Sequence, residues 1–336
     1  TNSTGTDNVA VGNLVMDGNT TGSRNTAVGE QALTANTTAN NNTAVGYHAA
    51  DANTTGTANV AIGAYALGAN TTASNNTALG YNALGANTTG ASNTALGKNA
   101  LDANTTASNN VAVGHDALTA NTTGYSNTAV GYYALGANTT GSYNTGIGKN
   151  AIDNCTTGSN NTAVGRNALT TITTGNDGTA LGFEALKATT TGAGNVGVGA
   201  SALTANTTGA MNTAVGYHAL KASDGDHNTA FGHSALIANT TGDNNLAVGR
   251  DTLTANTSGS RNVAVGRGAL AANTTVSDNT AVGYEALNDN TTGNNNVAMG
   301  AYALDANTTG DESVAIGYEA LTSAATLSRN VAVGYQ

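Results

Sequence analysis

One pattern of apolar and polar positions recurs at a regular spacing along the whole chain. Twenty copies of a short segment, typified by residues 25–29 (NTAVG), begin at Asn8 and end with the copy at Asn330. Consecutive copies form a 17-residue repeat, except for one step between Asn212 and Asn228 that is shorter by a single residue. A short unit repeated this often is typical of a solenoid, in which each coil packs only against its neighbours.

The consensus unit, numbered from this Asn, reads N-T-A-V-G-Y-x-A-L-x-A-N-T-T-G-x-x. Position 5 is Gly in every unit, from Gly12 to Gly334, which predicts a turn with a positive φ or a close approach between backbones. A second turn is predicted near position 15, which is mostly Gly. Two turns and two short extended stretches per unit predict one coil of a parallel β-solenoid, since a unit of this length cannot hold two helices and their turns.

The alternation of side chains along a strand suggests which positions face the interior. Position 2 is Thr or aliphatic and position 4 is Val, Leu, Ile, Phe or Met, so both are expected to point into the coil. Position 3 is Ala except at Gly146 and Gly197. Because no large or charged residue occurs there, we expect that face to be covered too, by another copy of the chain. Position 9, mostly Leu as in Leu33, is predicted to form the main core row, beside a small residue at position 8.

Position 12 is Asn in most units, with exceptions that include Cys155, Ile172, Thr189 and Ala324. These substitutes are small or apolar, so we expect position 12 to face inward. Stacked strands lie about 4.7–4.9 Å apart, which brings identical residues together and predicts a ladder of amides. The Asn also begins an Asn-Thr-Thr sequence that matches the N-glycosylation motif. An inward Asn would carry no glycan, and glycosylation of the turn threonines stays open.

Composition changes the picture less than the period does. Of 336 residues, 9% are charged and 4% aromatic, with no Pro and no Trp, a bulk composition close to that of disordered chains. The position-specific repeat overrules that interpretation. The net charge of −10 and the absence of a basic cluster disfavour nucleic-acid binding. Cys155 is the only cysteine, so the chain forms no internal disulfide. No apolar run approaches the length of a membrane span, so no membrane contact is predicted within this segment.

The chain starts and stops inside a repeat. Residues 1–5 match the second half of the unit, and the last unit breaks off at residues 335–336. We therefore expect residues 1–336 to form a single β-solenoid domain of about 20 coils that belongs to a longer fibre protein. Export and anchoring elements would then lie in other parts of that protein.

Residues 8–12, 59–63 and 313–317 (NVAVG, NVAIG and SVAIG) are similar to the head repeat of trimeric autotransporter adhesins. The whole unit, as in residues 127–141, also resembles repeats of bacterial and phage proteins described as tail-fibre-like. This resemblance implies a left-handed parallel β-roll, a parallel homotrimer and an extracellular location on a cell surface or a virion tail fibre. The adhesin heads have a shorter coil, so the extra residues here would enlarge a turn.

The role that the resemblance implies is a rigid shaft or head segment that contributes to attachment to a host or surface. Catalysis finds no support in the sequence, which predicts no enzyme and no cofactor. The five histidines are expected in different coils at outward or turn positions, with one pair, the fourth and fifth, considered for a shared site: His48, His115, His218, His227 and His233. Cys155 is predicted to be a buried, inert thiol. Five carboxylates share position 7 and are expected to form a solvated face: Asp116, Glu184, Asp251, Glu285 and Glu319.

A tyrosine row is the candidate contact surface. Position 6 is Tyr in several units, with Tyr65, Tyr133 and Tyr302 beside it at position 7. Exposed rings would suit stacking on sugars of a cell-surface glycan. The favoured interpretation is that they cover the turn and seal gaps between neighbouring chains. The six candidate residues are Tyr47, Tyr81, Tyr132, Tyr217, Tyr284 and Tyr318.

The doubled Thr row at positions 13 and 14, as in Thr37 and Thr38, provides an alternative function of a different class. Regular Thr ladders on a flat face order water in some ice-binding solenoids, and a monomer would leave such a face free. Only one Thr of each pair is expected to point outward, because neighbouring residues of an extended chain face opposite sides.

Overall fold

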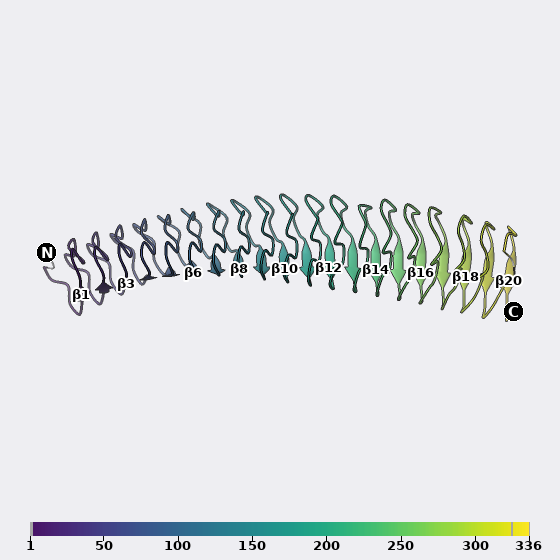
Figure 1. Ribbon diagram of the computed structural model, residues 1–336, viewed down its shortest axis with the longest axis horizontal. Helices are drawn as coiled ribbons and strands as arrows, with labels where there is room; N and C mark the ends of the chain where they lie inside the picture. The colour runs from purple at the N-terminus through teal and green to yellow at the C-terminus, as the bar shows by residue number, and fades with distance from the viewer. Residues whose placement is uncertain (1–2, 324, 336) are drawn as a thin grey trace. The chain divides into compact units, whose positions relative to one another are not determined.

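The computed structural model describes residues 3–323 and 325–335, which form an all-β parallel β-solenoid with a 17-residue repeat (Figure 1). The chain divides into two compact units. The first comprises Thr1–Asn167 with Thr171–Thr174, and the second comprises Ala168–Thr170 with Gly175–Gln336. The expectation of one domain over residues 1–336 stays a prediction.

Every strand has three residues and occupies positions 2 to 4 of the repeat. The first unit holds β1 (Val9–Val11), β2 (Thr26–Val28), β3 (Thr43–Val45), β4 (Val60–Ile62), β5 (Thr77–Leu79), β6 (Thr94–Leu96), β7 (Val111–Val113), β8 (Thr128–Val130), β9 (Thr145–Ile147) and β10 (Thr162–Val164). The second unit holds β11 (Thr179–Leu181), β12 (Val196–Val198), β13 (Thr213–Val215), β14 (Thr229–Phe231), β15 (Leu246–Val248), β16 (Val263–Val265), β17 (Thr280–Val282), β18 (Val297–Met299), β19 (Val314–Ile316) and β20 (Val331–Val333).

Within each unit every strand pairs in parallel with the next one in the chain, at a shift of one repeat. Ala27 of β2 thus lies beside Ala44 of β3, and Ala214 of β13 beside Ala230 of β14. The prediction of two extended stretches per coil is wrong, since each described coil has one strand and the rest is turns. Positive φ at positions 7, 9 and 17 turns the chain sharply on either side of positions 10–16, and these positions form turns and bends instead of a second strand.

The strand faces are opposite to those predicted. Ala27 at position 3 is completely buried, and its neighbours Thr26 and Val28 are only half-buried. The exceptions at position 3 show why. A Cβ atom at Gly146 would lie 3.4 Å from Leu135 Cγ and 3.1 Å from the Ala151 carbonyl oxygen. The space inside the coil therefore takes nothing larger than a methyl group from the strand, and the larger residues at positions 2 and 4 turn outward.

The core row at position 9 is confirmed. Leu33, Leu67 and the other Leu residues at position 9 up to Leu304 are fully buried, and Leu321 is half-buried. The Ala residues at position 8 are buried beside them. Leu33 has a φ of 51°, a left-handed conformation that costs about 1–2 kcal/mol for a residue with a Cβ atom. Complete burial of a leucine side chain contributes about 1.5–3 kcal/mol, which is enough to offset that strain. Its amide also donates to the Ala49 carbonyl of the next coil at 3.0 Å.

Two ladders of buried Asn side chains hold the coils together. The predicted ladder at position 12 is confirmed, since the amide of Asn36 donates to Asn19 Oδ1 at 2.8 Å and to the Ala39 carbonyl at 3.3 Å. A second ladder, at position 1, was not predicted. There the backbone N–H of Asn42 donates to Asn25 Oδ1 at 2.9 Å. Both side chains are almost completely buried, so each amide satisfies backbone groups that water cannot reach.

The position-12 ladder is interrupted where the sequence places another residue. Cys155, Ile172 and Thr189 are buried as predicted, and Ala324 lies outside the described residues. The side-chain oxygen Oδ1 of Asn138 has no hydrogen-bond partner because the next coil has Cys155 in place of the Asn that would donate to it. Oδ1 of Asn206 is unpaired as well, because the next coil is the shortened one and has Ser223 at position 12. Leaving a buried acceptor unpaired costs about 1–3 kcal/mol.

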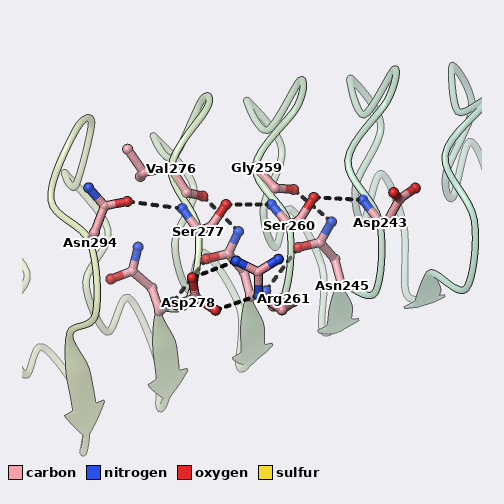
Figure 2. Close-up of polar contacts among 11 residues, drawn as sticks. Asp243, Asn245, Gly259, Ser260, Arg261, Val276, Ser277, Asp278 and Asn294 are labelled. Carbon is pink, nitrogen blue, oxygen red and sulfur yellow. Dashed lines mark hydrogen bonds and ion pairs between the residues drawn. The ribbon is translucent and has the colours of Figure 1, made fainter.

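A third ladder runs through position 16, which the sequence pattern presents only as a variable polar site. Figure 2 shows it in the second unit: Asp243 N–H donates to Ser260 Oγ, Ser260 N–H to Ser277 Oγ, and Ser277 N–H to Asn294 Oδ1. These distances are 3.0, 3.0 and 3.2 Å. The common requirement is a side-chain oxygen that accepts a backbone N–H of the preceding coil, and Ser, Asn and Asp all meet it.

The described residues contain no helix that is long and apolar enough to cross a membrane.

Candidate functional site

The candidate interaction surface is the outer face of the sheet in each unit. Position 4 is Val, Leu, Ile, Phe or Met in all twenty strands, and its side chains point away from the core. Leu79 is 39% exposed, Met299 44% and Phe231 56%. Because parallel strands stack about 4.7–4.9 Å apart, these side chains form a continuous apolar row in each unit, which we call the position-4 row.

Position 2 lies beside this row on the same face, since the two positions are separated by one inward residue. It is Thr, Val or, at Leu246, Leu. No strand carries a charged residue at positions 2, 3 or 4. The outer face is therefore uncharged and apolar along one edge, with hydroxyl groups and β-branched side chains along the other. Continuous exposed apolar surfaces are typical of contact sites, which makes this face the candidate interaction surface.

The Ala rows do not form this surface. They were expected to lie under a second copy of the chain, and the structure places them inside their own coil, in contact with the leucine row. The expectation that another copy of the chain covers the Ala face is therefore wrong. One face is covered by the coil itself, and the other, with positions 2 and 4, is open.

The predicted tyrosines are all exposed, between 36% for Tyr284 and 52% for Tyr81. They do not form one continuous row, because other residues fill position 6 in the coils between them. The structure instead groups them with rings from position 7. Tyr132 contacts Tyr133 with centroids 4.6 Å apart, and Tyr217 stacks on His218 at 3.8 Å.

Charged groups lie against several of these rings. The Lys149 ammonium lies 5.5 Å from the centroid of the Tyr132 ring, and the Arg267 guanidinium lies 5.6 Å from that of Tyr284. Such contacts are cation–π interactions. A hydrogen bond with Glu285 raises the pKa of the Tyr284 phenol. The aromatic groups therefore combine exposed ring surface with polar groups at their edges.

The position-7 carboxylates are less solvated than predicted. Asp116 is buried, and the other four are half-buried, because position 7 lies in a left-handed turn that packs against its neighbours. Four of the five histidines have contacts of their own. His48 Nδ1 lies 2.6 Å from Asp51, His115 pairs with Asp116, and His218 and His233 stack on Tyr217.

Among residues 3–323 and 325–335 no group of three or more His, Cys, Asp or Glu side chains is placed to hold a metal ion. His233 faces Asp251 at 3.7 Å, and the amide of His227 donates to Ala210. The contacts of these two histidines are thus with other residues.

Cys155 is completely buried, and its thiol donates to the Gly158 carbonyl at 3.4 Å. Burial raises the pKa of the thiol to about 11. Since the thiolate is the reactive form, we expect native protein at pH 8 to resist alkylation by iodoacetamide, whereas protein in guanidinium chloride should be labelled fully. Mass spectrometry of the two samples tests this. Rapid labelling of the native chain would contradict the buried position.

The two Thr rows differ, as expected from their neighbouring positions. The hydroxyl of Thr37 at position 13 donates to the Thr54 carbonyl of the next coil at 3.1 Å. Thr38 at position 14 is exposed. Position 13 is therefore part of the coil-to-coil bonding, and position 14 presents a row of hydroxyl groups to solvent.

No protein-family model and no curated protein matches this chain. The likeness to adhesin head repeats therefore rests on the repeat motif alone. Sequence reasoning found the tyrosines, yet it missed the position-4 row as a surface because it placed these residues in the core. The signal that points to it is the restriction of position 3 to Ala and Gly, the residues that fit the narrow interior.

Proposed function

We propose that this chain is a structural segment, shaft or head, of an extracellular trimeric fibre, either an adhesin or a phage tail fibre, that contributes to attachment to a host or surface. The observation that carries the proposal is the position-4 row. Twenty outward positions are apolar without exception, which a chain exposed to water on that face would not need.

Burying the outer face against copies of the same chain removes this apolar surface from water. Each square ångström of apolar surface buried contributes about 25 cal/mol, and a row repeated in every coil accumulates this gain along the axis. Since the face carries no charge, identical copies approach without like-charge repulsion. The number of three copies, their parallel direction and the extracellular location come from the resemblance to the adhesin heads and tail-fibre-like proteins.

Mechanically, such a segment would act as a stiff support. Backbone hydrogen bonds connect each coil to the next within a unit, and the two buried Asn ladders and the position-16 ladder add to them wherever their residues occur. Bending would strain many of these bonds together. A support of this kind would hold a binding tip away from the surface that carries it, and weak contacts repeated in several coils would add through avidity.

Light scattering on the purified chain tests the proposal, with the mass of three chains as the expected result. We then expect the triple variant Leu79→Lys, Leu96→Glu, Val113→Lys to be monomeric, since it places charges in the position-4 row. Alternating signs let neighbouring side chains pair across strands, so the coil itself should stay folded.

The matched control has the same three substitutions at position 14 of the same coils: Thr89→Lys, Thr106→Glu and Thr123→Lys. These side chains are exposed and lie away from the strand, so the control should keep the mass of the unchanged chain. A monomeric unchanged chain, or a trimer that survives the changes in the position-4 row, would exclude this face as the trimer interface.

Ice binding by a monomer is the second candidate, and the exposed hydroxyl row at position 14 supports it. The hydroxyl at position 13 is engaged in coil-to-coil hydrogen bonds, so one Thr row of the pair faces water. Large side chains of unequal size in the position-4 row, such as Phe231 and Met299, suit a protein contact better than a regular water lattice. Thermal hysteresis of a monomeric sample would favour ice binding over the fibre.

A further inference from the structure

Three tyrosines with the same spacing form a cluster in each unit, and in the second unit a fourth ring, Tyr335, stacks on Tyr318 with centroids 5.4 Å apart. In the first, Tyr65 lies 5.4 Å from Tyr47 and 6.0 Å from Tyr81, measured between ring centroids, at interplanar angles of 89° and 85°. In the second, Tyr302 lies 5.2 Å from Tyr284 and 6.1 Å from Tyr318, at 71° and 86°. We call these clusters the tyrosine triads.

Each triad follows from one local sequence feature. The outer two rings come from position 6 of coils that are two repeats apart, and the middle ring comes from position 7 of the coil between them. That middle coil has Ala at position 6, namely Ala64 or Ala301. The small residue leaves room for the position-7 ring to contact both neighbours edge to face, the arrangement that aromatic quadrupoles favour.

The triads do not have the distribution expected of a seam between chains. The position-4 row is apolar in every coil, whereas position 6 carries Lys98, Lys149, Arg166, Arg250 or Arg267 in the coils between the tyrosines. A seam along the axis would need apolar residues in every coil. Local clusters separated by charged residues are instead what discrete ligand sites require.

We propose that each tyrosine triad binds a neutral, linear, β-linked glycan, with sugar rings stacked on the two outer tyrosines. The outer rings of a triad are separated by two strand spacings, about 9.5 Å, so they would engage alternate sugar units of an extended chain. The C–H groups of a sugar face carry partial positive charge, which the negative face of an aromatic ring attracts. This site extends the proposed attachment role. It depends on that role only for the place where the protein would meet a glycan.

Polar groups around the triads fit the hydroxyl groups of such a ligand. The carboxylates of Glu285 and Glu319 raise the pKa of the neighbouring Tyr284 and Tyr318 phenols, and Asp51 lies beside His48 at the first triad. These acceptors and phenol groups stand at the edges of the exposed rings.

Charge and ring spacing argue against other ligands. Near the second triad burial, together with the charges of Asp289 and Glu319, raises the pKa of Asp305. This acidic surrounding and the net charge of −10 oppose an anionic glycan. A cation would need a gap between rings, and the rings of each triad are in direct contact at 5.2–6.1 Å.

Isothermal titration calorimetry with cellohexaose, chitohexaose and heparin tests the proposal. The unchanged chain should bind at least one neutral hexasaccharide and not heparin. The double variant Tyr65→Asn, Tyr302→Asn should bind it about tenfold more weakly or not at all, since each middle ring holds two others in place. Asn already occupies position 7 in other coils, such as Asn82 and Asn99, and favours the left-handed backbone found there.

The matched control is Tyr143→Asn, which removes a more exposed ring (55%, against 40% for Tyr65) with a φ of 60° at position 17, outside the triads. It should bind as the unchanged chain does. Absence of binding to both neutral sugars, binding to heparin alone, or equal affinity of the double variant would overturn the proposal. Light scattering of the double variant separates this site from assembly. An unchanged mass is expected, and a lower mass would show that the rings belong to the seam between chains.

Discussion

Replacing Gly131 with Ala is expected to cost about 4 kcal/mol or more in the free energy of unfolding. Gly131 at position 5 has a φ of 134°, which residues with a side chain rarely adopt. An added Cβ would also lie 2.7 Å from the carbonyl carbon of Gly148 in the next coil. The carbonyl oxygen of Gly148 would be equally close, and because both Gly148 atoms belong to the backbone, the coils would have to separate locally. Denaturant unfolding followed by circular dichroism measures the loss.

The control for this prediction is Gly68→Ala at position 10. The nearest atom to its added Cβ is the Tyr65 carbonyl oxygen at 3.3 Å, and other coils carry Asp102 or Thr119 at this position. We expect a change within about 1 kcal/mol, in the stabilising direction if the unfolded chain loses freedom. Equal effects of the two variants would show that the approach between coils at position 5 is not as close as described.

Replacing Asn93 with Ala is expected to lower the free energy of unfolding by about 2–4 kcal/mol. Asn93 Oδ1 accepts the backbone N–H of Asn110 at 2.9 Å, and its side-chain amide donates to the Ala107 carbonyl at 2.8 Å. The substitution leaves the buried N–H of Asn110 without an acceptor, which costs about 1–3 kcal/mol, and removes a second hydrogen bond worth about 1 kcal/mol. Chemical denaturation of the two proteins gives the difference.

A graded control comes from the chain itself, which has Ser313 at the same position. Ser313 Oγ accepts the backbone N–H of Asn330 at 3.2 Å, so a hydroxyl can replace the acceptor though not the donor. Asn93→Ser should therefore lose less stability than Asn93→Ala. If both variants lost the same amount, the ladder oxygen would not be the stabilising group.

Much of the coil was predictable because each position was sampled twenty times. The exceptions at a position reveal its environment. Cys155 and Ile172 in place of Asn marked position 12 as buried, and an invariant Gly marked the tight turn at position 5. The leucine row followed in the same way. These features depend on residues that repeat at one spacing, so the period alone brings them together.

The position-16 ladder could not be read in this way. The residues at this position differ in type, as in Ser260, Ser277 and Asn294. What they share is a side-chain oxygen at the same place in each coil. The tyrosine triads also needed the stacking of coils. Their rings alternate between positions 6 and 7, so the sequence separation from the first tyrosine to the second is longer than one repeat, and from the second to the third it is shorter. The sequence identified these rings as exposed candidates without showing which of them touch.

The sequence by itself determined the solenoid, its period, the glycine turn, the leucine row and the Asn ladder at position 12, because each depends on residue type at a repeated spacing. It also determined that positions 2 and 4 share one face of a three-residue strand. Only the tertiary structure decided that this face is the outer one. The interior beside the strand is bounded by Leu135 and its equivalents, which come from the turn of the preceding coil, and it leaves room for a methyl group alone. Alternation along a strand carries no information about this limit of volume.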